Sequence, residues 1–555
     1  MPQRVKDKLF DKNILKGIKI VDDFEVFKKF ESRKLKTSSV PGDIPPVIKK
    51  EFYVELAAPV ANIFNSITIS GEYPRQWIRE YATPIPKENP VESEDDLRPI
   101  SLTADLSKDY ENFLMDWLEP YVQRKLDPGQ MGGITGCSII HYLITLFNFI
   151  LEGLDINDNV PRSVVVALID YSKGFNRISH QNLIIRLSDW GVPGWLLRIL
   201  CSYLSGRTMI VRHKGVSSSE YPLPGGAGQG CLLGVLSFIV AISDAGMAVP
   251  EQPEEDPHID DVISVWHPEA AVNEFEVRQK YIDDQVQGEL LRLDQDLCPL
   301  PNDFIGPRTY HDRNGLVNKP NTRLQMRLND IESHTKIHQM KINEKKTKIM
   351  PFNFTRKYDF IPNYSINGQD LEVVYETKLL GVKIQSNCKW SSNTKHITKK
   401  AKSKLWYLRR LKHLGASDDT LIDLFKLHVR STLEMALPLW AGALTKSEIN
   451  SIERVQKISV KLILGNRYRE YNQALKDLDL ENLEIRRKNI CLKFAKKCLK
   501  NDRFKHWFPK RVSKNTRNKE MFIQPSGPHT KRYLTSSIPY LINILNENQI
   551  KQANK

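Results

Sequence analysis

Three aspartates hold positions in this sequence that favour metal chemistry. Asp283 and Asp284 are adjacent, and short apolar stretches flank them. Because neighbouring side chains on a strand point to opposite faces, the two can share one site only at a tight turn. Like charges held together there are costly unless a cation compensates them, and Mg²⁺ is commonly held by one or two carboxylates plus substrate phosphates. An isolated pair of this kind is more often a solvated turn.

A third aspartate favours a metal site over a solvated turn. Asp170 follows residues 163–169, an apolar, β-branched run of the length of a fully buried strand. An acid that directly follows a buried strand lies at the edge of a sheet, where α/β and α+β folds place metal ligands. The structural alternative is that Asp170 caps the segment after it.

The segments that carry these aspartates resemble the reverse transcriptase of non-LTR retrotransposons, and the resemblance covers residues 38–500. Its motifs occur in the order of that family, at residues 85–87, 97–102, 129–132 with a helix over 141–149, 167–175, 228–234, 281–284, 342–348 and 378–382. The chain departs from the family at Asn176, where aspartate is usual, and at Gly228 and Val235, where proline is more common.

The resemblance implies two-metal nucleotidyl transfer by a nucleotidyltransferase. Asp170, Asp283 and Asp284 would hold two Mg²⁺ ions, with Mn²⁺ as an alternative. One of the adjacent Lys345 and Lys346 would neutralise or protonate the leaving pyrophosphate, and we take Lys346 as the candidate.

The resemblance also implies a nucleotide-binding set. Lys87 and Arg98 would contact the triphosphate or the template, because these side chains make strong charge-assisted bonds to phosphate. Phe175 would pack under the sugar and exclude a ribose 2′-hydroxyl, and Gln229 would hydrogen-bond the nucleotide within a glycine-rich turn. The alternatives are solvated charges for Lys87 and Arg98, and core packing for Phe175.

A second acidic pair is predicted to lie outside the metal site. Residues 251–261 are rich in acids and proline, and we expect an exposed, mobile insertion. Asp260 and Asp261 belong to it, with flanking proline, no strand before them and no aromatic residue leading into them.

Two basic segments follow the last motif. Residues 395–413 hold eight Lys and Arg and no acid, interleaved with apolar residues, which predicts an amphipathic helix that tracks a duplex through its phosphates. Residues 485–519 hold fourteen Lys and Arg against Asp502 alone, and their aromatic residues, Phe504, Trp507 and Phe508, suit RNA or single strands. Residues 520–555 are expected to be poorly ordered apart from a short helix near 540–545.

Composition narrows the class of protein. The 555 residues carry a net charge of +15, which favours a polyanionic partner. Seven scattered cysteines without a CxxC pair indicate a reducing compartment and no structural zinc. The charged N-terminus is not a signal peptide, and the most apolar stretches, 139–151 and 232–249, are predicted to be buried helices rather than membrane spans. We therefore expect an intracellular protein of the nucleus or cytoplasm, not a secreted one.

The predicted fold class is α+β, a right-hand polymerase with a helical thumb and a basic C-terminal region. The expected divisions are an N-terminal helical extension over 1–70, fingers and palm over 71–385, the thumb over 386–470 and the basic region over 471–555. No stretch before residue 80 has room for an endonuclease, so the chain resembles the polymerase part of such an element alone.

The predicted function is an RNA-directed DNA polymerase of a retrotransposon. Its partners would be an RNA template, a DNA primer, the RNA–DNA duplex and deoxynucleoside triphosphates. One alternative is a catalytically decayed or domesticated protein of this kind that still binds RNA or DNA. Another is a maturase-like protein that acts on one RNA.

Overall fold

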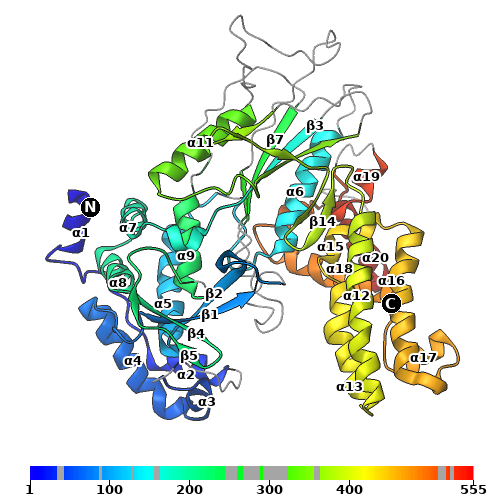
Figure 1. The fold of residues 1–555 in the computed structure, drawn as a ribbon, viewed down its shortest axis with the longest axis horizontal. Helices are drawn as coiled ribbons and strands as arrows, with labels where there is room; N and C mark the ends of the chain where they lie inside the picture. Colours follow the sequence, from blue (N-terminus) through cyan, green and yellow to red (C-terminus); the bar gives the residue numbers. More distant parts are fainter. Residues whose placement is uncertain are drawn as a thin grey trace, which may run out of the picture.

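The computed structural model describes residues 1–33, 40, 43–86, 90–127, 129–155, 163–228, 230–243, 245, 259–266, 288–291, 323–354, 363–510, 521–525 and 530–553. In Figure 1 the N-terminal helices, in blue, and the C-terminal helices, in yellow to red, lie on opposite sides of the view.

A five-stranded sheet separates two apolar cores. Its order is β12-β9-β3-β7-β8, with bounds Glu372–Val373, Lys348–Asn353, Ser163–Ile169, Ile259–Trp266 and Gly288–Leu291. β3 runs antiparallel to β9 and parallel to β7. Val165, Ala167 and Ile169 enter the first core, whereas Val164, Val166 and Leu168 enter the second. The prediction of a strand buried on both faces is therefore confirmed.

The first core joins the N-terminal helices to one face of this sheet. Its helices are α1 (Gln3–Leu9), α2 (Asp23–Glu31), α4 (Tyr53–Ser70), α5 (Asp105–Val122), α7 (His180–Asp189), α8 (Gly194–Leu204), α9 (Leu232–Ile242) and α11 (Arg323–Ile337). The short helix α3 (Pro46–Glu51) contacts α2 and α4. A second sheet has the order β2-β1-β4-β5, with β6 paired to β4. Its strands are β1 (Arg79–Pro86), β2 (Leu97–Leu102), β4 (Thr208–His213), β5 (Val216–Ser217) and β6 (Tyr221–Pro222).

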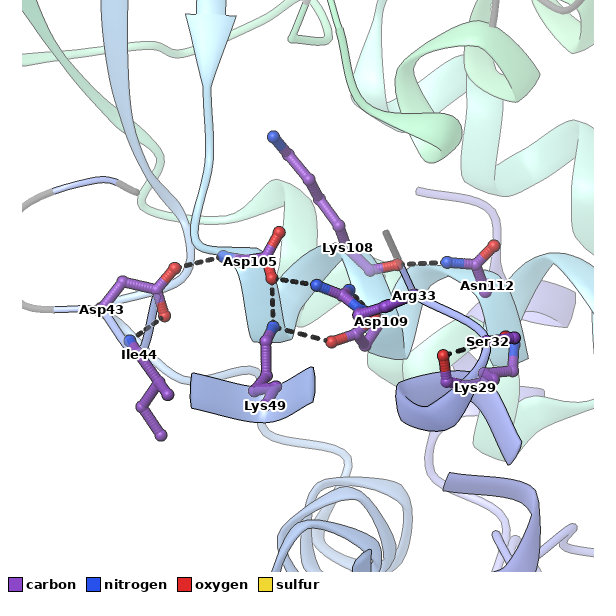
Figure 2. Close-up of polar contacts among 10 residues, drawn as sticks. All are labelled: Lys29, Ser32, Arg33, Asp43, Ile44, Lys49, Asp105, Lys108, Asp109 and Asn112. Atoms are coloured by element: carbon purple, nitrogen blue, oxygen red, sulfur yellow. Dashed lines mark hydrogen bonds and ion pairs between the residues drawn. The ribbon is translucent and has the colours of Figure 1, made fainter. Parts of the chain in front are cut away.

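A buried cluster of charges holds the N-terminal segment against α5. Lys49 of α3 is fully buried and pairs with Asp105 and with Asp109, the latter at 2.9 Å. Arg33, just after α2, pairs with the same two carboxylates. Figure 2 shows both cations pointing between Asp105 and Asp109. Since a lone charge at such a depth would be strongly disfavoured, the cluster fixes how this segment docks.

The second core contains α6 (Ile139–Leu154) and most of the C-terminal half of the chain. The helices there are α12 (Ser391–His413), α13 (Asp418–Leu424), α14 (Ser431–Leu433), α15 (Leu437–Trp440), α16 (Lys446–Leu464), α17 (Tyr471–Asp477), α18 (Leu483–Leu499), α19 (Lys531–Leu534) and α20 (Ser537–Ala553), with a π-helical turn at Phe425–Arg430. Two short hairpins, β10 (Ser365–Ile366) with β11 (Gln369–Asp370) and β13 (Glu376–Leu379) with β14 (Val382–Gln385), precede α12.

Residues 379–384, which overlap the motif at 378–382, form a hairpin rather than a single strand. The chain turns at Leu380 and Gly381, both with positive φ (49° and 82°), and β13 pairs antiparallel with β14. Two consecutive residues with positive φ are the geometry of a two-residue hairpin turn. The apolar run reads as one strand because both arms of the hairpin contribute buried residues.

Two expectations for the C-terminal region are wrong. Phe504, Trp507 and Phe508 are at most 6% exposed, so they pack in the second core and are not available to stack on bases. The ring of His141, on α6, stacks on Phe504 with centroids 4.1 Å apart. Residues 537–553 form a long helix, α20, whose Leu541 and Ile542 are fully buried.

Further bonds anchor the same tail to the segments around α6. The Arg503 guanidinium donates to the Gln130 carbonyl at 2.8 Å. The Tyr533 hydroxyl donates to Glu152 at 3.1 Å, and the Thr530 backbone N–H donates to Asp155 at 2.8 Å. Within the described ranges, no helix is long and apolar enough to span a bilayer.

Candidate active site

Asp170 lies at the edge of the central sheet, directly after β3, and is 3% exposed. Its backbone N–H donates to the Thr347 hydroxyl at 3.3 Å, and its carbonyl accepts from the Asn343 N–H at 2.7 Å. Thr347 is fully buried, and its own N–H closes a turn onto the Asn343 carbonyl at 2.9 Å. The segment that carries Lys346 is therefore fastened to the backbone of Asp170, and the Lys346 side chain is exposed.

The glycine-rich turn, residues 225–230, packs against the segment after Asp170. The Ala227 N–H donates to the Phe175 carbonyl at 2.8 Å, and the Gly226 N–H donates to the Ile178 carbonyl at 2.9 Å. Gly226 has φ of +81°, and a Cβ there would lie 2.8 Å from the Asn176 Cα. Only glycine satisfies both the backbone angle and the close approach.

A histidine supports the same turn from the other side. The Nε2 atom of His180 lies 2.6 Å from the Gly226 carbonyl oxygen. Burial lowers the pKa of His180, so the neutral ring that donates through Nε2 is favoured at neutral pH.

A buried polar network lies beneath the next residues of the turn. Glu80 of β1 and Arg207 are each 1% exposed and form an ion pair. The Arg207 guanidinium lies 4.6 Å from the centre of the Tyr203 ring, whose hydroxyl is 3.3 Å from the sulfur of Cys231. A Cβ at Gly228 would lie 3.0 Å from the Glu80 carboxylate, so the pair and the turn are packed tightly together.

Glu111 holds the start of α9. Its carboxylate accepts from the backbone N–H groups of Leu232 and Leu233, at 2.9 and 3.3 Å. These donors belong to the first turn of the helix, where no intrahelical acceptor exists and a negative charge is favoured. Burial raises the pKa of Glu111. The helix that follows the glycine-rich turn is thus capped by a residue far from it in sequence.

The structure places half of the predicted site residues. Phe175 is 3% exposed, and its ring stacks on Phe238 with centroids 5.1 Å apart, so one face of the ring is used for core packing. Arg98 is half-buried in β2, opposite Ile85 of β1. Asp170 and Lys346 lie together, as described. Four predicted residues are outside the described residues: Lys87, Gln229, Asp283 and Asp284.

The second acidic pair is in a strand, which corrects part of the expected insertion. Asp260 and Asp261 lie in β7 and pair with Val164 and Val165 of β3, whereas residues 251–258 are outside the described residues. The sequence offers no strand signal before this pair, but the segment forms a strand because it pairs with β3. Asp261 is opposite a residue five positions before Asp170, a separation of about 16 Å along the strand. The pair is therefore at the other end of the sheet from Asp170.

Sequence reasoning missed the supporting residues Glu80, Arg207 and Glu111. None belongs to a local motif, because each acts through a partner more than 100 positions away. Among the residues that the structure describes, no group of three or more His, Cys, Asp or Glu side chains could hold a metal ion.

Comparison with known proteins agrees with this geometry. One stretch of the chain, residues 85–268, matches the family described as "Reverse transcriptase (RNA-dependent DNA polymerase)". It includes Asp170 and the glycine-rich turn and ends before Asp283. The resemblance found in the sequence is confirmed.

Two relatives from Drosophila melanogaster are similar to part of the chain. The chain is 28% identical over 223 residues to "Probable RNA-directed DNA polymerase from transposon BS", covering 40% of this chain and 24% of the relative. It is 29% identical over 202 residues to "RNA-directed DNA polymerase from mobile element jockey", covering 36% and 22%. The chain thus spans about a quarter of the length of these relatives.

One solved structure is similar at a lower sequence identity than these relatives. The telomerase from Candida tropicalis, in complex with a fragment of telomeric RNA, aligns with 90% of this chain and 65% of its own, at 10% identity and a TM-score of 0.36.

Proposed function

We propose that this chain is an RNA-directed DNA polymerase of a retrotransposon, which extends a primer 3′ end by nucleotidyl transfer. The observation that carries the proposal is the position of Asp170. It follows the central strand of a segment that matches the reverse transcriptase family. The turn with Lys346 is bonded to its backbone, and the glycine-rich turn is bonded to the segment that follows it.

The sheet topology supports a shared site for the three aspartates. Val265 of β7 pairs with Ile169, next to Asp170, and Gly288, the first residue of β8, pairs with Trp266. β8 therefore starts at the sheet edge where Asp170 lies. Asp284 precedes Gly288 by four positions, a stretch that spans at most about 14 Å. We propose that Asp283 and Asp284 reach this edge.

The donor chemistry fits magnesium. Carboxylate oxygens are the ligands that Mg²⁺ prefers, and Asp170 is positioned on a buried strand end rather than a free loop. Asp170, Asp283 and Asp284 would hold the two ions, which supply charge neutralisation and a lowered pKa of the primer hydroxyl when bound. Lys346 is exposed on the adjoining turn, where its ammonium would stabilise the negative charge of the leaving pyrophosphate.

The nucleic-acid partners are proposed from an exposed face of α12. Ile397, Leu405 and Leu408 are buried, so the helix has one apolar face. The opposite face exposes lysines and arginines together with Trp406 and Tyr407, at 59% and 52%. Exposed aromatic residues among cations are typical of nucleic-acid contacts. We propose that this face holds the RNA–DNA duplex as the thumb.

The cellular location follows from the same proposal. A polymerase with RNA template, DNA primer and deoxynucleoside triphosphates as partners acts in the nucleus or cytoplasm. Six cysteines of the described residues are free thiols, which fits a reducing compartment.

Primer extension on poly(rA)/oligo(dT) with Mg²⁺ tests the function. We expect Asp170→Asn and the double change Asp283→Asn with Asp284→Asn each to abolish extension. The matched control is Asp260→Asn with Asp261→Asn, which removes two carboxylates at the other end of the sheet and should retain activity. Loss of activity only in the control would move the metal site to β7. Absence of extension by the wild type, with RNA binding retained, would favour the catalytically decayed alternative.

A further inference from the structure

A cavity of 680 Å³ lies in the C-terminal half of the molecule, and none of the predicted site residues lines it. It is enclosed by α6, the start of α12, the α15–α16 region and the α19–α20 region. Its volume is within the range of sites that bind a small ligand.

Cations predominate among the charged residues of the cavity. Lys389, Lys395, Lys531 and Arg532 line it, against Glu448 as the single acid among its lining residues. Within the described residues, none of these four cations is at ion-pair distance from a carboxylate. The Glu448 carboxylate is already used, since it accepts from the Thr445 backbone N–H at 2.8 Å and from the Thr445 hydroxyl at 2.7 Å. The cavity therefore has a surplus of positive charge.

Three long helices begin at the same cavity. The first turns of α12, α16 and α20 contribute Ser391, Ser447 and Ser537 to the lining. Each helix N-terminus carries a partial positive charge from its backbone N–H groups. Their convergence adds to the surplus charge of the side chains and favours a bound anion.

A buried hydroxyl independently indicates a ligand. Thr394 lines the cavity and is 3% exposed, and its Oγ1 has no hydrogen-bond partner among the described residues. A buried hydroxyl without a partner costs free energy, unless a bound group supplies the acceptor.

Part of the lining is apolar and aromatic. Phe147, Leu151, Trp390 and Leu439 are each at most 5% exposed. The rings of Phe147 and Trp390 pack with centroids 5.0 Å apart. Such a surface accommodates a flat, weakly polar group, which inorganic phosphate lacks and a nucleobase provides.

We propose that this cavity binds a nucleotide, with its phosphate at the cations and Thr394 and its base against the apolar wall. The ligand is either a free mononucleotide or one unpaired nucleotide of a single strand. The site goes beyond the proposed polymerase function, because it shares no residue with the site at Asp170.

The test measures binding of the full chain to a fluorescein-labelled 12-nucleotide single-stranded RNA by anisotropy, in EDTA. Without divalent metal the result does not depend on polymerase activity. We expect Lys531→Glu to weaken binding at least about tenfold, because it removes a charge-assisted bond and adds repulsion. Thr394→Val keeps the shape of the side chain and leaves no buried polar atom, so it should fold normally and weaken binding about threefold or more.

The matched control is Lys551→Glu, an equal charge change at an exposed position of α20 outside the cavity lining. It should alter binding less than twofold. Equal losses in Lys531→Glu and Lys551→Glu, or no loss in Thr394→Val, would overturn the proposal.

Competition identifies the source of the nucleotide. Displacement of the RNA by AMP, lost in Thr394→Val, identifies a mononucleotide site. Displacement by unlabelled RNA alone, equally sensitive to Thr394→Val, identifies a nucleotide within a strand. Competition by inorganic phosphate or by a poly-glutamate peptide as strong as that by nucleotides would show that the cavity recognises negative charge only, and would overturn the proposal.

Discussion

Replacement of Glu111 by alanine should loosen the start of α9. The change leaves the N–H groups of Leu232 and Leu233 without their acceptor. A buried donor without a partner costs about 1–3 kcal/mol, and loss of an N-cap costs about 1 kcal/mol, so the two donors together should cost about 2–4 kcal/mol. Because α9 directly follows the glycine-rich turn, primer extension should fall as well.

Two further variants separate capping from charge. Glu111→Gln keeps one carbonyl acceptor, and the expected loss is about 1 kcal/mol. Asp116→Ala, at an exposed position on the same helix, controls for shortening an acid and should change stability by less than about 0.5 kcal/mol. Urea denaturation of the three variants and the wild type measures these differences. Equal losses for Glu111→Gln and Glu111→Ala would refute the capping argument.

The pH dependence gives an independent check on Glu111. Burial raises the pKa of this carboxyl above its ordinary value of 4.5. The folded protein therefore binds a proton at Glu111 more tightly than the unfolded chain does. The stability that comes from this difference is complete below pH 4.5 and is lost as pH rises through the pKa of Glu111 in the folded protein. Glu111→Gln cannot titrate, so its deficit relative to the wild type should shrink as pH rises from 4.5 toward 7. A deficit that grows over this range would contradict the assignment.

Three other changes have definite expected results. Gly226→Ala should destabilise the protein by about 1–3 kcal/mol and reduce extension, because it adds a Cβ 2.8 Å from another backbone atom at a residue with positive φ. Gly215→Ala, where a Cβ would have no atom within 4 Å, should cost less in the same denaturation assay. Lys49→Met should cost about 3–5 kcal/mol by leaving two carboxylates with one cation, and a loss under 1 kcal/mol would show that water reaches the cluster. Trp406→Ala should leave the melting temperature unchanged and weaken binding to an RNA–DNA duplex about tenfold in a gel-shift titration.

Elements whose own side chains fill a core were predictable from sequence. The strand expected at 163–169 has those bounds, and the buried helix expected in the apolar stretch 232–249 is α9, Leu232–Ile242. A continuous apolar run fixes both the element and its burial. The apolar periodicity of residues 48–69 is typical of one helix, but the chain is divided at Phe52 into α3 and α4, because a short break leaves the periodicity intact.

Features that depend on distant partners were not predictable. The aromatic residues of 504–508 have the composition of an RNA-binding segment, but α6 supplies their packing surface. The residues of the candidate site show the same difference between local and distant features. Asp170 was identified by the strand before it, whereas the hydroxyl of Thr347 that meets its backbone, 177 positions away, leaves no local pattern. The domain divisions at residues 70, 385 and 470 remain predictions.

The packing of the C-terminal tail on α6 affects how the protein is made. Tyr533 contacts Glu152 across 381 positions, so the surface of α6 is completed by residues that leave the ribosome late. At about 5–20 residues per second, that separation corresponds to roughly 20–80 s of translation. During this time the apolar face of α6 has no cover from α19 and α20. A gene truncated after the motif at residues 378–382 would therefore yield a chain with an open core and a tendency to aggregate, not a smaller polymerase.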